Sequence, residues 1–267
     1  MTAGIDLTIL RSLLFVPANR PDRFAKAAKA EPDAVILDLE DAVGEADKES
    51  AREKLATDFT DLPVIVRINA SGTPWHQRDV AAVRALKPAG VILPKAETGQ
   101  GFAGVVAALQ GEVPLIALIE TALGLANARA IAATEGVQRL AFGSVDYCAD
   151  LACDHLREIL LPARVELVLA SRLAGISPPI DGVTTVLDDP SVAAGDAAHA
   201  RSLGMSGKLC IHPRQIAPVR RAFAPSEAEI AWARRVLAAG DGAVSVEGAM
   251  VDEPVRRRAR TILASIG

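Results

Sequence analysis

The sequence predicts an α/β fold, a (β/α)₈ barrel with additional helices after its last strand. Three observations favour this fold. Short aliphatic and β-branched runs alternate with Ala-rich amphipathic segments along most of the chain, which is typical of parallel strands joined by helices. Eight such units follow one another, and no Pro-, Gly- or Ser-rich linker divides them. The chain has 267 residues, close to the roughly 250 of a single-domain barrel. An open doubly wound sheet is the alternative.

The expected strands are short runs with enough Val, Ile and Leu to fill a barrel interior. In chain order they cover residues 13–17, 34–40, 64–69, 90–95, 115–120, 139–146, 180–186 and 208–213. Between them, Ala-rich segments with apolar residues at helical spacing predict helices. These helices cover residues 24–30, 49–59, 78–86, 102–110, 125–133, 157–175 and 193–204.

The chain continues beyond the needs of a barrel. Residues 226–240 and 251–266 are expected to be helical, and the Gly-containing stretch 241–250 separates them. We therefore predict a barrel at residues 1–223 that carries the active site, and a helical extension at residues 224–267 that caps the barrel mouth or reaches a neighbouring subunit. Its basic cluster is interpreted as a solvated helix face or a subunit contact rather than an anion site. The cluster consists of Arg256, Arg257, Arg258 and Arg260.

Composition excludes several classes of partner. The 29 basic and 33 acidic residues give a net charge of −4, and aromatic residues make up only 3%, so nucleic acid is not expected to bind. No apolar run approaches the roughly 20 residues that span a bilayer. The segment of the first twelve residues is too short and too weakly basic for a secretory signal. We expect a cytoplasmic protein that does not bind membranes.

Polar side chains follow nearly every expected strand, and the carboxyl ends of barrel strands build active sites. Glu120 and Asp146 end the fifth and sixth strands. Carboxylates on buried strands need a compensating cation, and Mg²⁺ typically takes one or two carboxylates while it keeps positions for water and substrate oxygens. We predict that Glu120 and Asp146 bind the metal. Alternatively, they cap the following helices or pair with Arg67 or Lys95.

An acidic trio, Asp38, Glu40 and Asp41, ends the second expected strand. It could itself be the metal site. Asp38 and Glu40, however, share one face of the strand, where they could orient metal-bound water or arginines. We therefore assign the trio, together with Lys95, a supporting role around the metal ligands.

Three basic positions are candidates for substrate binding. Arg67 lies within a hydrophobic strand, and its planar guanidinium suits a substrate carboxylate; an internal salt bridge to the acidic trio is the alternative. Arg20 and Lys26 flank the start of the first helix and could hold phosphates there, although ordinary surface charge explains them nearly as well. His212 follows the last strand, and a binding or packing role is expected because no second histidine lies at metal-ligand spacing.

Residues 99–104 match the pattern GxGxxG before a helix, which occurs in dinucleotide-binding folds. The context is poor, because three residues separate the first glycine from the preceding strand and three strand–helix units already precede it. Dinucleotide binding is therefore not the favoured interpretation.

Taken together, these residues are recognisable: the chain resembles the citrate lyase β-subunit-like branch of the HpcH/HpaI aldolase and malyl-CoA lyase superfamily. The resemblance covers nearly the whole length, and its segments occur in the same order. They are RSLLFVPANRPDRFAKA, VILDLEDAV, VIVRINA, VILPKAE, LIALIETALGLANA, LAFGSVDY, GKLCIHPRQI and VEGAMVDEP.

The resemblance implies a (β/α)₈ barrel assembled as trimers or hexamers, with Mg²⁺, for which Mn²⁺ could substitute, held by Glu120 and Asp146. Arg67 would bind the carboxylate or enolate end of the substrate, and backbone around Val145 and Asp146 would shape an oxyanion site. Asp252 would reach a neighbour's active site as the acid/base group. The positions that match coenzyme A contacts are Phe15, Val16, Arg20, Lys26, Ile211 and His212.

One position departs from the family pattern. Relatives commonly carry an acidic or a small residue immediately before the metal-binding aspartate, where this chain has Val145. This change should leave the metal site intact and alter the shape of the pocket.

The resulting hypothesis is an Mg²⁺-dependent carbon–carbon lyase or Claisen-type condensing enzyme. Its substrate would be the CoA thioester of a malyl-, citramalyl- or citryl-like 2-hydroxy acid. The reaction would yield or use an acyl-CoA and a 2-oxo acid. Two alternatives remain: an aldolase that uses the same metal on free 2-oxo acids without CoA, and a non-catalytic subunit or adaptor that binds an acyl carrier.

Overall fold

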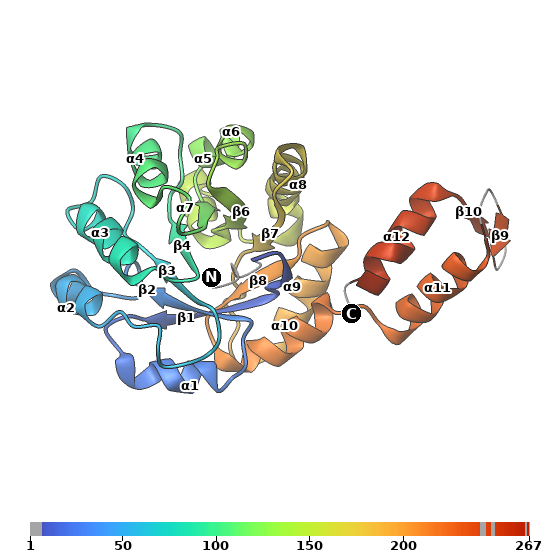
Figure 1. Ribbon diagram of the computed structural model, residues 1–267, viewed down its shortest axis with the longest axis horizontal. Helices are drawn as coiled ribbons and strands as arrows, with labels where there is room; N and C mark the ends of the chain where they lie inside the picture. Colours follow the sequence, from blue (N-terminus) through green and yellow to red (C-terminus); the bar gives the residue numbers. More distant parts are fainter. Residues whose placement is uncertain (1–6, 241–243, 247–248, 265, 267) are drawn as a thin grey trace. The chain divides into compact units, whose positions relative to one another are not determined.

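The chain folds around a closed barrel of eight parallel strands, which confirms the predicted (β/α)₈ architecture (Figure 1). The computed structural model describes residues 7–240, 244–246, 249–264 and 266. Strands β1 to β8 pair in sequence order, and β8 closes on β1. Their bounds are β1 Ser12–Pro17, β2 Ala34–Asp38, β3 Val64–Arg67, β4 Gly90–Leu93, β5 Leu115–Ile119, β6 Val137–Phe142, β7 Ser177–Asp181 and β8 Gly207–Cys210.

The helices of the barrel lie outside the strands (Figure 1). Local capping sets several of their ends: the Thr121 hydroxyl accepts a hydrogen bond from Gly124 at the start of α5, and Asp189 caps α9, which has a proline in its first turn. The helices are α1 Phe24–Ala28, α2 Lys48–Glu53, α3 His76–Leu86, α4 Gln100–Leu109, α5 Ala122–Ala126, α6 Ala128–Ala132, α7 Ser144–Leu151, α8 Arg157–Ala174, α9 Pro190–Ser202 and α10 Ile216–Phe223.

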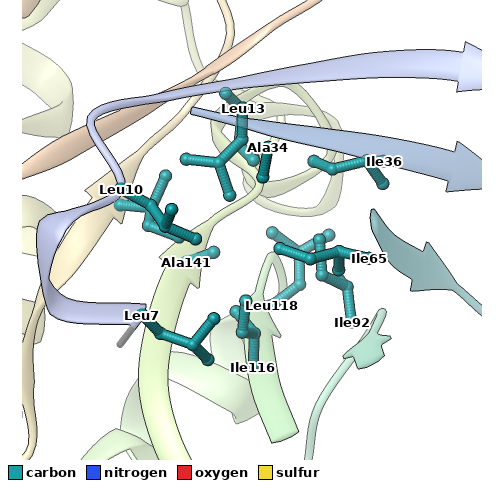
Figure 2. Close-up of a cluster of buried hydrophobic side chains, with 12 residues drawn as sticks. Leu7, Leu10, Leu13, Ala34, Ile36, Ile65, Ile92, Ile116, Leu118 and Ala141 are labelled. Carbon is teal, nitrogen blue, oxygen red and sulfur yellow. The ribbon is translucent and has the colours of Figure 1, made fainter. Parts of the chain in front are cut away.

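Inward-facing aliphatic side chains fill the barrel (Figure 2). The cluster combines Leu and Ile from successive strands with Leu7 and Leu10, which precede β1, and each of its buried members is at most 3% exposed. Near the amino end of β6, Arg139 is fully buried and donates hydrogen bonds to the carbonyl oxygens of Leu7, Leu10 and Pro178. Among the described residues, the barrel is thus packed at this end, and active sites of such barrels lie at the other, carboxyl end of the strands.

The expected strands differ from the observed ones by one to three residues at either end, except for the sixth and the seventh, which differ more. The sixth was expected to continue to residue 146, but β6 ends at Phe142 and α7 begins at Ser144, where the Tyr147 amide donates to the Gly143 carbonyl. Asp146 therefore lies in the first turn of a helix and not at a strand end. The seventh was expected at residues 180–186, but β7 covers Ser177–Asp181. Residues 183–187 have no strand partner and lead into α9.

The chain divides into two compact units, residues 1–220 and 221–267. The predicted roles of residues 1–223 and 224–267 stay predictions. Within the second unit, α11 (Glu227–Ala238) and α12 (Glu253–Ala264) pack through Ala233, Val236 and Ala259. A short antiparallel pair joins them, β9 (Val244–Val246) and β10 (Ala249–Val251). Parts of the predicted stretch 241–250, residues 241–243 and 247–248, lie outside the described residues.

The basic cluster of α12 is not uniformly solvated, so that prediction is wrong for one member. Arg256 is 5% exposed and its Nε donates to the Gly240 carbonyl, whereas Arg260 is exposed and pairs with Glu253. Helical spacing places Arg256 on the inner face of α12, where the Gly240 carbonyl is one of its partners. Among the described helices, none combines the length and the apolar character needed to cross a bilayer.

Candidate active site

A cavity of about 350 Å³ opens among the carboxyl ends of the barrel strands. Its wall combines apolar side chains from β1, β5, β6 and β8 with charged groups that follow β2, β3 and β5 and with the first turn of α7. The lining residues are Phe15, Asp38, Asp41, Ala42, Arg67, Leu118, Glu120, Phe142, Gly143, Ser144, Val145, Asp146, Val183, Leu209 and Ile211. A mostly apolar wall with a few convergent charges is typical of a small-molecule site.

Glu120, directly after β5, is 1% exposed and is held by the neighbouring strand end. Its Oε1 accepts a hydrogen bond of 2.8 Å from the Lys95 amide, and the Lys95 ammonium lies 3.9 Å from the same oxygen. Lys95 adopts a left-handed backbone conformation with φ of 46°, which is uncommon for a residue with a side chain. Such local strain typically accumulates at functional sites, and here it accompanies an amide directed at the carboxylate.

The ligand-free environment disfavours a negative charge on Glu120. Burial, together with the charges of Glu40 and Asp146, raises the pKa of its carboxyl group to about 8, and Lys95 partly offsets these effects. Asp146 is half-buried in the first turn of α7 and faces the same cavity. The two carboxyl groups thus interact electrostatically across one wall, as neighbouring ligands of a cation would.

Gly143 lets these two groups approach each other. A Cβ at this position would lie 2.2 Å from Glu120 Oε2 and 2.4 Å from Glu120 Cβ, so no other residue fits without a shift. The connection from β6 to α7 can therefore pass directly over Glu120 and bring Asp146 to the cavity. Sequence reasoning did not single out Gly143, because a glycine required for close approach looks the same as one in an ordinary turn.

The donor set fits a hard divalent cation. Five carboxyl groups surround the site, and among the described residues Arg67 and Lys95 are the cations paired with them. Among the described residues, no group of three or more His, Cys, Asp or Glu side chains is arranged as a complete metal site. Two carboxylates with further positions open to water and substrate match the chemistry of Mg²⁺, which is rarely enclosed by protein ligands alone.

Arg67, at the end of β3, lines the same cavity and is 8% exposed. Its Nε and Nη2 each donate to a different Asp38 oxygen at 2.7 Å, and its guanidinium lies 4.7 Å from the centre of the Phe15 ring. Burial alone would lower the pKa of Arg67, but the charge of Asp38 and its hydrogen bonds raise it above its usual value. Arg67 thus forms a salt bridge with the acidic trio, which was the alternative expected from the sequence.

The remaining acidic residues connect Arg67 with Glu120. Glu40 is 3.1 Å from Arg67 Nη1 and 3.1 Å from the Lys95 ammonium, and Asp41 is 3.2 Å from Arg67 Nη1. Burial raises the pKa of Glu40, although Arg67 and Lys95 oppose this effect. The predicted supporting group thus surrounds Arg67 and the Glu120 carboxylate, and Glu40 and Lys95 form a charged bridge between them.

Lys48, at the start of α2, is a site residue that the sequence did not reveal. It is 6% exposed, donates to the carbonyl oxygens of Leu39 and Glu40 at 2.9 and 2.8 Å, and stacks over the Trp75 ring at 5.3 Å. This ammonium fixes the backbone that carries the acidic trio. A lone lysine in a short polar segment gives no signal of such burial.

The residues predicted to contact coenzyme A fall into separate groups. Phe15 and Ile211 line the cavity, as does Val145, the position that departs from the family pattern. Val16 is buried at 3% exposure and does not line it. Arg20 is exposed and forms a bidentate pair with Asp22.

The other predicted contacts lie outside the cavity wall. Lys26 is exposed on α1, and His212 accepts a hydrogen bond from the Arg214 amide at the start of the 3₁₀ turn Pro213–Gln215. Asp252 belongs to the second unit, where its carboxylate accepts from the Val255 amide in the first turn of α12. Their proposed contacts with coenzyme A or with a neighbour's site stay predictions.

Comparison with known proteins supports the predicted family resemblance independently of the site's geometry. The sequence profile of the HpcH/HpaI aldolase/citrate lyase family matches residues 11–213. A citrate lyase subunit beta-like protein of Deinococcus radiodurans is 41% identical over 277 residues, 96% of this chain and 97% of that protein. A (3S)-malyl-CoA thioesterase of Cereibacter sphaeroides is 34% identical over 269 residues, 95% of this chain and 93% of that protein. CitE from Mycobacterium tuberculosis, solved with magnesium, acetoacetate and coenzyme A, is 40% identical, with a TM-score of 0.85 over 96% of this chain and 97% of that one.

Proposed function

Because the chain belongs to the HpcH/HpaI aldolase/citrate lyase family, we propose that it is an Mg²⁺-dependent carbon–carbon lyase or Claisen-type condensing enzyme that acts on a CoA thioester. Its substrate would be a malyl-, citramalyl- or citryl-like 2-hydroxy acid, and the products an acyl-CoA and a 2-oxo acid. Family membership confirms the predicted lyase class. The observation that carries the finer proposal is the pair of carboxyl groups, Glu120 and Asp146, that lines one cavity together with Arg67.

Glu120 and Asp146 would hold the cation, which when bound supplies a Lewis acid for a carbonyl or alkoxide oxygen. Arg67 would bind the carboxylate of the acid and offset negative charge that develops during bond cleavage. Its bidentate pairing with Asp38 fixes the guanidinium plane before substrate arrives. The first backbone amides of α7, at Val145 and Asp146, lack partners within the helix and would stabilise an oxyanion.

CoA dependence is favoured over the free-acid alternative by two observations. The related CitE structure contains coenzyme A together with magnesium and acetoacetate. The cavity of about 350 Å³ suits the acyl end of a thioester, and the exposed cations Arg20 and Lys26 near the carboxyl end of β1 could bind phosphates outside it. Titration with CoA and with acetyl-CoA would separate the two, since an enzyme for free acids should show no binding heat.

We further propose a homo-oligomer, a trimer or hexamer, in which residues 224–267 cap the barrel mouth or reach a neighbour. Asp252 would be the group that transfers a proton at the substrate carbon. Its carboxylate is half-buried at the start of α12, where the hydrogen bond from the Val255 amide orients it.

The metal assignment is tested with Glu120→Gln and Asp146→Asn, which keep side-chain shape and remove the charge. Turnover of malyl-, citramalyl-, β-methylmalyl- and citryl-CoA is measured with Mg²⁺, with Mn²⁺ and after chelation, by following both acyl-CoA and free CoA. Each variant should lose Mg²⁺ affinity and at least about 100-fold in turnover. The matched control is Asp150→Asn, an exposed carboxylate on the same helix, which should behave like the parent. Unchanged Mg²⁺ binding and turnover in the first two variants would refute the assignment.

A further inference from the structure

The start of α7 carries two parts of the proposed site: the Asp146 carboxylate and the first backbone amides of the helix, at Val145 and Asp146. This helix has eight residues, Ser144–Leu151, and a helix of that length is not stable by itself in water. Contacts with other elements must therefore set the position of its first turn. Ser144, the first residue of the helix, makes several of these contacts.

The Ser144 side chain is hydrogen-bonded to a histidine that follows the same helix. Ser144 is 1% exposed, and its Oγ lies 2.9 Å from Nε2 of His155, in the connection between α7 and α8. The chain reverses at the end of α7 through Ala152, which has a left-handed φ of 53°, and the Cys153 amide donates to the Cys148 carbonyl. The hydrogen bond from His155 to Ser144 thus ties this connection to the start of the helix.

His155 is exposed, so its ring contributes little to the packed core. Partial burial lowers the pKa of the imidazole, and the charges of Arg164 and Lys208 lower it further, although Asp196 opposes them. The ring is therefore mainly neutral at pH 7, with one nitrogen that donates and one that accepts. Replacing His155 should consequently disturb the start of α7 rather than the barrel.

Ser144 is also packed closely against the end of β7. A Cβ at Gly182 would lie 2.2 Å from Ser144 Oγ and 2.9 Å from the Phe142 carbonyl oxygen, so the chain after β7 passes directly over Ser144. A buried ion pair that the proposed reaction does not use holds this segment, because the Lys208 ammonium donates to the Gly182 carbonyl and, at 2.9 Å, to Asp181. The barrel thus supplies one anchor for Ser144, and the histidine supplies another.

We propose that His155 is a positioning residue for the metal site: through Ser144 it orients the first turn of α7, and with it the Asp146 carboxylate and the amides at Val145 and Asp146. This inference rests on the proposed function, in which Asp146 binds the cation. Ser144 lines the catalytic cavity, whereas His155, among the described residues, is not part of its wall. His155 therefore acts through Ser144 and not by contact with the substrate.

Calorimetric titration of the full chain with Mg²⁺ tests this role, together with turnover of the CoA thioesters named above. His155→Ala should weaken Mg²⁺ binding about tenfold and lower kcat by a similar factor, as when groups that orient a metal ligand are removed. KM for the thioester should stay within about threefold, because Phe15 and Ile211 keep their places in the cavity wall.

Two further variants of this connection serve as controls. The amide of His155→Gln can occupy the place of Nε2 and keep the hydrogen bond to Ser144, so Mg²⁺ affinity and kcat should stay within about threefold of the parent. Asp154→Asn changes an exposed neighbour and should behave like the parent.

Ser144→Ala removes the hydroxyl and should cause the same losses as His155→Ala. If the two residues act through one bond, the double variant should lose no more than either single variant, whereas independent effects would multiply to about 100-fold. Nitrogen-15 NMR supplies a readout that needs no metal, because the Nε2 resonance of His155 should shift in Ser144→Ala.

Glu120→Gln separates this inference from the proposed function. If Glu120→Gln loses Mg²⁺ affinity while His155→Ala keeps it, His155 has no positioning role and the metal assignment stands. If both variants keep it, the metal assignment fails, and the inference that rests on it fails too. Losses that multiply in the double variant, or a His155→Gln as impaired as His155→Ala, would also overturn the inference.

Discussion

At the scale of single residues, the ligand-free protein holds Glu120 in an environment that disfavours its charge. With a pKa of about 8 in the folded chain and about 4.3 when unfolded, this carboxyl group binds more protons in the folded state between those values. Stability should therefore fall as pH rises from about 4.3 to 8, and no further change from this group is expected above 8. The loss of stability reaches its full size above pH 8, where the carboxyl group is ionised in the folded protein as well.

Glu120→Gln removes that cost, because the neutral amide can still accept the Lys95 amide hydrogen bond. With chelator present, the variant should be more stable than the parent, and its advantage should grow by about 3 kcal/mol between pH 6 and pH 9. Urea denaturation at the two pH values measures this difference. Added Mg²⁺ should reverse the order at pH 9, since only the parent can bind it. A pH-independent advantage would show that Glu120 is ionised in the folded protein at both values.

At the scale of elements, the junction between β6 and α7 determines whether the two proposed metal ligands, Glu120 and Asp146, meet. Gly143→Ala would place a methyl group 2.2 Å from Glu120 Oε2, so either the carboxylate or the junction must move. We expect Mg²⁺ affinity to fall at least about tenfold, as when the groups that orient a metal ligand are disturbed. Titration with Mg²⁺ measures the loss.

Gly104→Ala is the matched control. Gly104 lies within α4, and nothing would lie within 4 Å of a Cβ there. This substitution should leave Mg²⁺ affinity unchanged and raise the free energy of unfolding by about 0.5–1 kcal/mol, because alanine favours the helix. Equal Mg²⁺ affinity in the two alanine variants would show that Gly143 has no special role in the site.

The strands themselves could be predicted from the sequence, whereas the end of β6 and some site residues could not. Hydrophobic runs such as residues 64–67 and 90–93 are distinctive because parallel barrel strands are buried on both faces, and all eight were found. The end of β6 was misplaced, since LAFGSVDY is apolar enough for a strand and the helix start at Ser144 depends on contacts with other strands. Glu120 and Arg67 were recognisable as charges that interrupt such runs. Lys48 and Gly143 were not, because their roles depend on tertiary neighbours.

At the scale of the whole molecule, the remaining question is which chain supplies Asp252. The barrel unit contains the proposed metal ligands and Arg67, whereas Asp252 belongs to the second unit, residues 221–267. If Asp252 acts in a neighbour's site, Glu120→Gln and Asp252→Asn disable different halves of a shared site. Each variant alone should lose at least about 100-fold in turnover, and Asp252→Asn should keep its Mg²⁺ affinity.

Co-expression of these two variants with different tags, followed by purification on both, then distinguishes the two arrangements. After selection on both tags, random assembly would pair an intact Glu120 with a neighbour's intact Asp252 in about one third of the sites of mixed trimers and about a quarter of those of mixed hexamers, so turnover should recover to about that fraction of the parent value. If the extension instead caps its own barrel, every site carries one defect and turnover should stay at the level of the single variants. Separately purified variants mixed without exchange serve as the control, because their subunits cannot share a site.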